Sequence, residues 1–181
     1  MAAFPRYNIV MKEEKNIYPQ NIIFLDFDGV MTSRREGGYL YHDPKEYGFD
    51  REIVKRLRKL CVECNARIVI SSNWRKFDIG QTFTFNGKTV ENPLPKLRKE
   101  LGDYIFDTLP PEKYIRKSEC TLLWFDDNPG FKGNYIILDD DVSEGFYDYP
   151  QLKSHFICCD AEFGLTDEIC SAIKKILVKS N

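Results

Sequence analysis

The sequence predicts an α/β protein in which a parallel β-sheet is flanked by helices, and two observations lead to this prediction. Short, almost continuous apolar runs alternate along the chain with segments whose apolar residues recur at helical spacing. Such alternation is typical of strands that are buried on both faces and joined by helical crossovers. The chain has 181 residues without an internal repeat or linker-like tract, which suits one domain. We therefore expect a single domain over residues 1–181, with its core at about 21–178.

The first half of the chain contains the patterns of two strands, two helices and a hairpin. Asn21–Asp26 and Arg67–Ser71 are apolar runs that predict buried strands. Residues 50–65 predict a helix that begins with an aspartate cap, and Leu94–Leu101 predicts a short helix after a proline. Thr and Phe alternate up to an Asn-Gly pair within residues 81–90, which indicates a β-hairpin inserted between these elements.

The second half repeats the alternation. Short strands are expected at Tyr104–Phe106, Tyr135–Leu138 and Ser154–Cys158, and a helix is expected at Ser118–Phe125. Thr166 is suited to capping a last helix, because two acidic residues and then an apolar stripe follow it. Strands and helices that alternate in this way predict a parallel sheet covered on both faces.

Composition excludes several classes of protein. The chain carries 26 Lys and Arg against 28 Asp and Glu, and its net charge of −2 argues against coating nucleic acid by bulk charge. With 43% hydrophobic residues it is unlike a disordered chain. Apolar runs such as Ile22–Leu25 are too short to span a membrane, and no secretory signal pattern precedes them. We expect a cytoplasmic protein without a membrane partner, whose six cysteines are free and buried.

Polar residues follow three of the predicted strands, at the ends where parallel α/β sheets bind ligands. They are Asp26-Phe27-Asp28-Gly29, Ser71-Ser72 and Asp139-Asp140-Asp141. Carboxylates from neighbouring strands repel each other unless a cation neutralises them, and a site made of oxygen ligands favours Mg²⁺ over zinc. Acids that only cap helices or solvate strand ends are the alternative, but that alternative does not account for two acidic clusters and a hydroxyl pair together. The sequence therefore predicts a Mg²⁺ site at this edge of the sheet.

These motifs resemble those of a known superfamily. IIFLDFDGV (Ile22–Val30), RIVISS and YIILDDD resemble the first, second and fourth motifs of the haloacid dehalogenase (HAD) superfamily, most of whose members are Mg²⁺-dependent phosphatases and phosphotransferases. SSNWR (Ser71–Arg75), Arg116 with Glu119 ahead of a tryptophan, and FGLT further resemble the HAD domain of Swiss-army-knife RNA repair proteins. The resemblance implies a single HAD-like Rossmannoid domain.

The resemblance also implies roles for the polar residues. Asp26 would be the nucleophile that forms an aspartyl-phosphate, and Asp28 would be the general acid and base. The metal would be held by Asp26, by the backbone carbonyl of Asp28, and by Asp139 or Asp140. Ser71 would donate a hydrogen bond to a phosphate oxygen.

A cation must also stabilise the phosphoryl charge, and the sequence leaves its identity open. Arg116 fits the family pattern, adjacent Lys117 has the same charge, and Lys113 is a third candidate. Ser72 and Arg75 are expected to bind substrate, because the planar guanidinium of an arginine suits a second phosphate or a carboxylate. Trp74 follows the same strand end and so should project near the site, but we expect it to be a core residue.

The spacing between motifs leaves little or no room for a cap domain over the site. About twenty residues separate Asp28 from the next helix, and the segment from Arg75 to Arg116 has about forty residues, which include the small hairpin flap and are fewer than a full α/β cap needs. An open site admits bulky phosphate esters, so phosphorylated RNA or DNA ends are candidate substrates of a Mg²⁺-dependent phosphomonoesterase. The alternatives are a phosphatase for a small nucleotide or sugar phosphate, and a catalytically silent HAD-like domain that binds a phosphorylated ligand or a protein.

Overall fold

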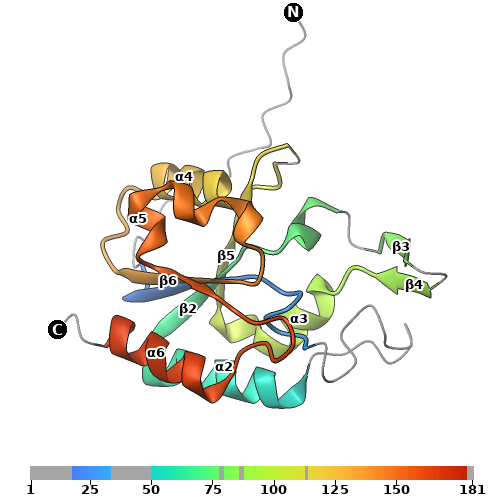
Figure 1. Ribbon diagram of the computed structural model, residues 1–181, viewed down its shortest axis with the longest axis horizontal. Coiled ribbons are helices and arrows are strands. Elements are labelled where there is room, and N and C mark those ends of the chain that lie inside the picture. The colour runs from blue at the N-terminus through green and yellow to red at the C-terminus, as the bar shows by residue number, and fades with distance from the viewer. Residues whose placement is uncertain (1–17, 34–49, 78–79, 86–87, 113, 179–181) are drawn as a thin grey trace, which may run out of the picture.

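A computed structural model of the chain describes residues 18–33, 50–77, 80–85, 88–112 and 114–178 (Figure 1). Three expectations concern residues outside these ranges. They are the absence of a helical cap in the segment that includes 34–49, the Asn-Gly turn at 86–87, and the candidate cation Lys113.

The central element is a five-stranded parallel sheet with the order β5-β2-β1-β6-β7. Its strands are β1 (Asn21–Leu25), β2 (Ala66–Ile70), β5 (Ile105–Thr108), β6 (Asn134–Asp139) and β7 (Phe156–Cys158). From β1 the chain first builds the sheet toward β5 and then returns to build it toward β7, so β1 lies where the direction of winding reverses. In open parallel sheets a ligand crevice forms at this point, beyond the carboxyl ends of the strands.

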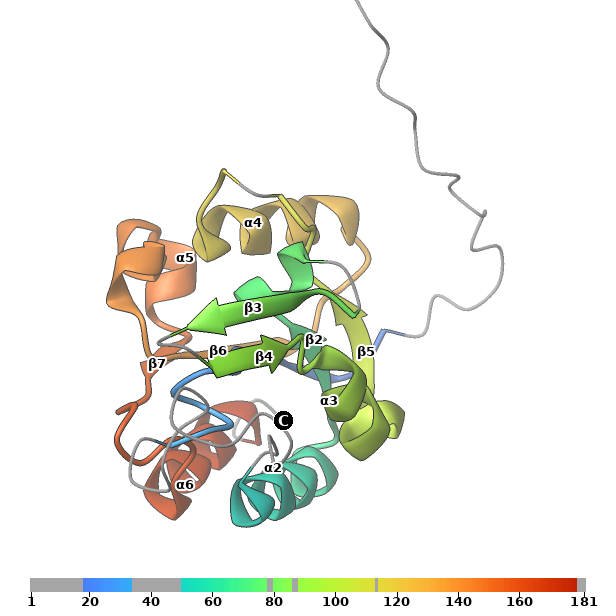
Figure 2. The same cartoon turned by 90° about the vertical axis from the view of Figure 1, so that its right-hand side faces the viewer.

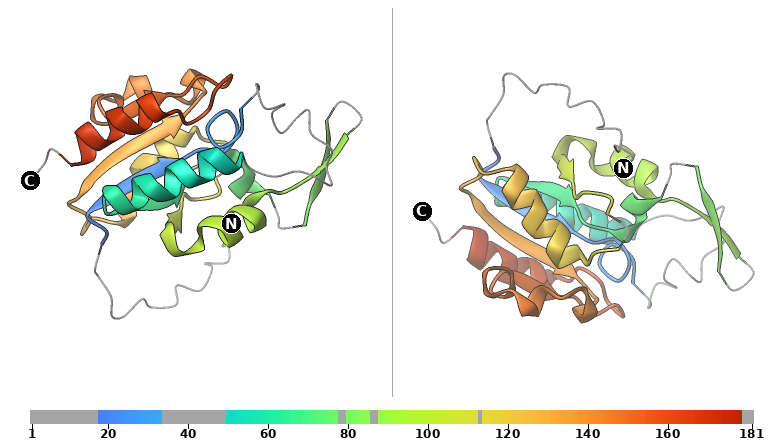
Figure 3. Two further views of the ribbon diagram at one scale, coloured as in Figure 1. Left: turned by 90° about the horizontal axis from the view of Figure 1, so that it is seen from below. Right: turned by 90° about the horizontal axis from the view of Figure 1, so that it is seen from above.

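Helices cover both faces of the sheet (Figures 1 and 3). One face is covered by α2 (Arg51–Glu63), α3 (Leu94–Leu101) and α6 (Asp167–Leu177), and the other by α4 (Lys117–Asp127) and α5 (Pro150–Lys153). The predicted α/β fold with a parallel sheet between helices is therefore confirmed. Within the part of the chain that the structure describes, no helix has the length and apolarity needed to cross a membrane.

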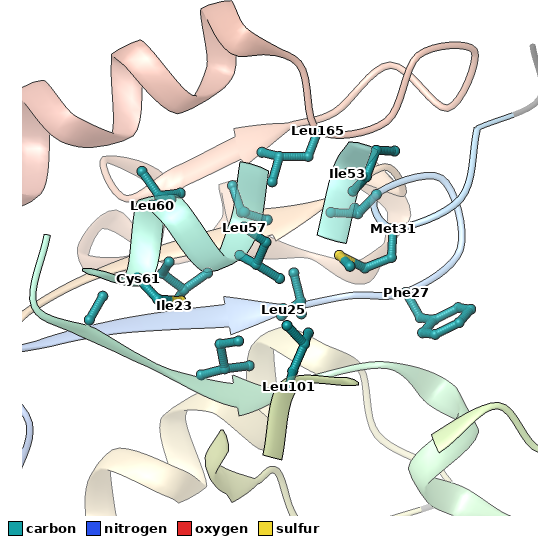
Figure 4. Packing of buried hydrophobic residues seen from close by; sticks show 14 of the residues in the cluster. Ile23, Leu25, Phe27, Met31, Ile53, Leu57, Leu60, Cys61, Leu101 and Leu165 are labelled. Carbon is teal, nitrogen blue, oxygen red and sulfur yellow. The ribbon is translucent and has the colours of Figure 1, made fainter. Parts of the chain in front are cut away.

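The core explains why β1 is a rigid support. Ile23 and Leu25 pack against Leu57 and Leu60 of α2 (Figure 4), whereas the intervening Phe24 packs edge-on against the tryptophan of α4, with ring centroids 5.3 Å apart. All five residues of β1 are buried. Burial of one such side chain stabilises the fold by about 1.5–3 kcal/mol, so the residues that follow β1 begin from a firmly held point.

The expected hairpin is present as a separate two-stranded antiparallel sheet of β3 (Thr82–Phe85) and β4 (Lys88–Glu91). It stands beyond the carboxyl ends of the large sheet (Figures 1 and 2). Asn92, directly after β4, ties it to the domain, because its side-chain amide donates to the carbonyl oxygens of Trp74 and Phe77 at 3.2 and 3.1 Å. The small flap is thus anchored to the segment that follows β2.

Four short 3₁₀ helices and α5 have no counterpart in the sequence prediction. The 3₁₀ helices are η1 (Asn73–Lys76), η2 (Gly102–Tyr104), η3 (Val142–Glu144) and η4 (Phe146–Asp148). Each has three or four residues, too few to show a helical period. All six cysteines are free thiols, and five are buried, but the expectation of a buried thiol is wrong for Cys158, which is exposed at the end of the edge strand β7.

Candidate active site

Three carboxyl groups meet at the carboxyl ends of β1 and β6. The two strands are paired in register, with Leu25 opposite Leu138, and the backbone N–H of Asp26 continues the ladder by donating to the carbonyl of Leu138 at 2.9 Å. This places Asp26 level with Asp139. Carboxylate oxygens of Asp26, Asp139 and Asp140 all lie within 4.8 Å of one another, so a single ion could contact all three.

The turn after β1 depends on Gly29. Its φ of +69° lies in the left-handed region that disfavours residues with a side chain. A Cβ atom at this position would also collide with the carboxyl group of Asp140. Glycine therefore allows the first acidic motif and the last one to approach closely.

Lys117 is buried between these carboxylates. Its Nζ lies 2.7 Å from Asp139 Oδ2 and 3.0 Å from Asp26 Oδ2, and its side chain is 4% exposed. Burial alone would lower the pKa of Lys117, but the charges of Asp26 and Asp139 outweigh it and raise that pKa above its ordinary value. Lys117 is therefore a fixed positive charge at neutral pH.

Arg116, the other described candidate for this cation, points away from the carboxylates. It is the residue before α4, where the backbone is extended, and its guanidinium pairs with Asp148 Oδ2 at 2.5 Å on the surface. Its backbone N–H donates to Glu119 at 2.9 Å, so the arginine and the glutamate of this motif form the start of the helix. Of the two, only Lys117 lies among the site carboxylates.

Glu144 and Asn73 belong to the same cluster. Asn73 lies within the SSNWR motif, although no role was predicted for it, and no sequence signal pointed to Glu144. Glu144 accepts the backbone N–H of Lys117 at 2.8 Å with one oxygen and the side-chain amide of Asn73 at 2.8 Å with the other. It thereby links η3, η1 and the start of α4. Glu144 is the last residue of η3, five residues beyond β6, so only the path of the chain after β6 brings it to the site.

Asp28 is held by the side chain of Trp74. The indole Nε1–H of Trp74 donates to Asp28 Oδ2 at 2.8 Å, whereas Asp28 Oδ1 is buried without a hydrogen-bond partner among the described residues. Burial, followed by the neighbouring charge of Asp26, raises the pKa of Asp28 to about 7. Trp74 is buried, as expected of a core residue, but it also contacts the site.

The two serines after β2 differ. Ser71 is fully buried, and in the described part of the chain its Oγ has no hydrogen-bond partner, so it retains a hydroxyl donor. Ser72 is also buried, but its Oγ accepts the backbone N–H of Trp74 at 3.4 Å and caps η1. A hydroxyl that accepts a hydrogen bond can still donate one, so the binding of substrate by Ser72 stays a prediction.

Arg75 is likewise directed into the protein. Its guanidinium donates to the carbonyl oxygens of Ser71 at 2.7 Å, Ser72 at 3.1 Å and Pro110 at 3.0 Å, and it reaches the thiol of Cys120. The residue is 8% exposed. The predicted contact between Arg75 and substrate is therefore corrected: its donors hold the loops after β2 and β5, where backbone carbonyls need partners.

The acidic groups line a cavity of about 370 Å³. Its lining residues are Asp26, Asp28, Asn73, Lys117, Asp140 and Asp141. Burial and the charge of Asp26 raise the pKa values of Asp139 and Asp140, and Lys117 offsets this in part. The cluster has more carboxylates than cations, and the carboxylates all offer oxygen atoms as ligands. These groups fit a hard divalent cation, which would relieve the repulsion between the carboxylates.

Together, the fold and this carboxylate site define a domain of the HAD superfamily. The motifs that carry the site lie on β1, after β2, at the start of α4 and at the end of β6. The chain belongs to the family described as HAD domain in Swiss Army Knife RNA repair proteins, which matches residues 22–170. No curated protein and no solved structure matches the chain. Family membership supports a phosphohydrolase-type activity.

Proposed function

We propose that the protein is a Mg²⁺-dependent phosphomonoester hydrolase that forms an aspartyl-phosphate on Asp26. The observation that supports this most strongly is the convergence of the carboxylates of Asp26, Asp139 and Asp140 around one point, with Lys117 beside them. A nucleophile must approach a phosphate dianion, and it does so only where positive charge screens the repulsion.

The reaction takes two displacements. In the first, a carboxylate oxygen of Asp26 bonds to phosphorus, the bond from phosphorus to the ester oxygen breaks, and Asp28 gives its proton to the departing oxygen. In the second, Asp28 takes a proton from water as the water oxygen attacks phosphorus, and the bond to Asp26 breaks to release inorganic phosphate. A carboxyl whose pKa is about 7 is suited to both roles near neutral pH.

The remaining residues hold the phosphoryl group. Lys117 supplies a buried positive charge next to the nucleophile, and the unpartnered hydroxyl of Ser71 supplies a donor. Donors fixed before the reaction stabilise the charge of the transition state without further reorganisation. Asp26, Asp139 and Asp140 would hold the magnesium ion, which when bound shields the nucleophile and aligns the transferring group.

Phosphorylated ends of RNA or DNA are the proposed substrates. The description of the family to which the chain belongs places this domain in RNA repair proteins. The flap of β3 and β4 also stands beyond the carboxyl ends of the large sheet (Figure 2), where it is placed to meet a substrate larger than the cavity.

The first experiment is hydrolysis of p-nitrophenyl phosphate with Mg²⁺ and with EDTA, comparing the wild type with Asp26→Asn. We expect activity only with Mg²⁺ and a loss on the order of 10³-fold or more in the variant. Asp126→Asn, at the exposed far end of α4, is the matched control and should behave as wild type. Undiminished turnover by Asp26→Asn would exclude the proposed nucleophile.

Substrate class is tested separately. Oligonucleotides of RNA and DNA with a 3′- or 5′-phosphate are compared with the corresponding mononucleotides at equal concentration. We expect kcat/KM to be higher for at least one class of oligonucleotide end than for its mononucleotide. Equal or higher values for mononucleotides would favour a small-molecule phosphatase and would contradict the nucleic-acid proposal.

A further inference from the structure

The geometry points to Trp74 as a positioning residue for the proton transfer, a role that rests on the proposed function. We infer that its indole N–H holds Asp28 Oδ2, so that the carboxyl group is oriented to give its proton to the leaving group and later to take one from water.

The contact has one possible direction. An indole nitrogen can only donate a hydrogen bond, so Trp74 Nε1–H donates to Asp28 Oδ2, at 2.8 Å. If the proton of a neutral Asp28 were on Oδ2, it would compete with the indole hydrogen for the same side of the carboxyl group. The indole therefore fixes the orientation of the Asp28 carboxyl group.

Asp28 faces the cavity that contains Asp26 and Lys117, because all three residues line it. Its Oδ1 is buried, and no described residue makes a hydrogen bond to it. The indole of Trp74 therefore sets how the Asp28 carboxyl group is presented to a substrate in this cavity.

Trp74 is itself held in place from several sides. Its backbone N–H donates to Ser72 Oγ at 3.4 Å, and its carbonyl accepts from the amide of Asn92 at 3.2 Å. Its ring packs edge-on against Phe77, with centroids 6.2 Å apart. Asn92 follows β4 directly and contacts Trp74. The residue that anchors the flap therefore also holds the residue that supports Asp28.

The role has a kinetic signature. A well-placed acid matters most when the leaving group is a poor one, because an alkoxide needs its proton as the bond to phosphorus breaks, whereas an acidic phenol leaves without it. Loss of the indole donor should therefore slow alkyl phosphates much more than activated aryl phosphates. A merely structural defect would slow all substrates by one factor.

The test compares Trp74→Phe with the wild type on a series from 2,4-dinitrophenyl phosphate through phenyl phosphate to an alkyl phosphate. We expect kcat/KM to fall by about threefold for the first and by about 30-fold or more for the last. Trp124→Phe is the matched control, since its indole also donates to a carboxylate, Asp107 Oδ2, at 2.8 Å, but on α4 away from the cavity. It should lower thermal stability without changing the dependence on leaving group.

The outcomes separate the two proposals. Equal losses for every leaving group in Trp74→Phe would overturn the positioning role and leave the proposed function standing. A wild-type protein that hydrolyses none of these esters would overturn both.

A second measurement needs no change at Trp74. The chain has two tryptophans, so ¹⁵N-labelled protein shows two indole N–H signals, which Trp124→Phe assigns. Asp28→Ala should shift the Trp74 signal and leave the Trp124 signal in place. An unmoved Trp74 signal would refute the contact.

Discussion

Replacement of Lys117 by methionine should destabilise the protein strongly, because it removes the positive charge between two buried carboxylates. Asp26 and Asp139 are 4% and 0% exposed and lie 3.0 and 2.7 Å from its Nζ. Removal of one partner from a buried ion pair costs about 3–5 kcal/mol. For a domain of this size each kcal/mol corresponds to about 2–4 °C in Tm, so Tm should fall by about 6–20 °C.

The assay is thermal and urea unfolding, followed by circular dichroism at pH 7.5 in EDTA. Because the pKa of Lys117 is raised in the fold, its contribution is fully present below the pKa of an unfolded lysine and is lost only as pH rises through the folded value. At pH 7.5 the contribution of Lys117 to stability is therefore fully present. Mg²⁺ should restore part of the stability of the variant by supplying the lost positive charge.

Lys59→Met is the matched control. Lys59 is 72% exposed and lies 3.8 Å from Glu63 on the surface of α2, where such pairs contribute at most about 1 kcal/mol. A Lys117→Met protein that unfolds within about 1 kcal/mol of the wild type would refute the role assigned to the buried charge. The phosphatase activity of Lys117→Met should fall by about 10²-fold or more, as when a fixed transition-state donor is removed.

Three further substitutions separate local roles. Gly29→Ala should destabilise the fold by about 1–2 kcal/mol because of the positive φ alone. It should also weaken Mg²⁺ binding, because the added Cβ displaces Asp140, and an unchanged Mg²⁺ dependence of activity would contradict this. Arg75→Met should cost about 2–3 kcal/mol by leaving buried carbonyls unpaired at unchanged KM, whereas a raised KM with unchanged Tm would restore the predicted substrate contact. Arg116→Gln should keep wild-type kcat, since its guanidinium pairs with Asp148; a loss near that of Lys117→Met would show that the assignment of the cation is wrong.

Much of the fold could be predicted because its signals are local. The apolar run at 21–26 and the helical period at 50–65 appear in the structure as β1 and α2 with bounds shifted by one or two residues. The hairpin at 81–90 appears as β3 and β4, with β4 extending to residue 91. Acids at the ends of two strands lie together because neighbouring parallel strands end at the same edge of the sheet.

The direction of individual side chains could not be predicted. Arg116 and Lys117 are adjacent and equally charged, yet the start of α4 sends one to solvent and the other between two carboxylates. Arg75 has the chemistry of a phosphate ligand, but unpaired carbonyl oxygens in two loops take up its donors. Which donor meets which acceptor depends on how separate loops pack, and the periodicity of the sequence carries no information about that packing.

The sequence alone thus determined the α/β class, the strand ends and the residue types able to hold a metal ion, because these follow from hydrophobic period and from the ends of parallel strands. Only the tertiary structure decided that Lys117 faces Asp26, that Glu144 orients Lys117 and Asn73, and that Trp74 holds Asp28. Those contacts join residues as far apart in the sequence as Asp26 and Lys117, and their geometry is set by the packing of the whole core rather than by any local pattern.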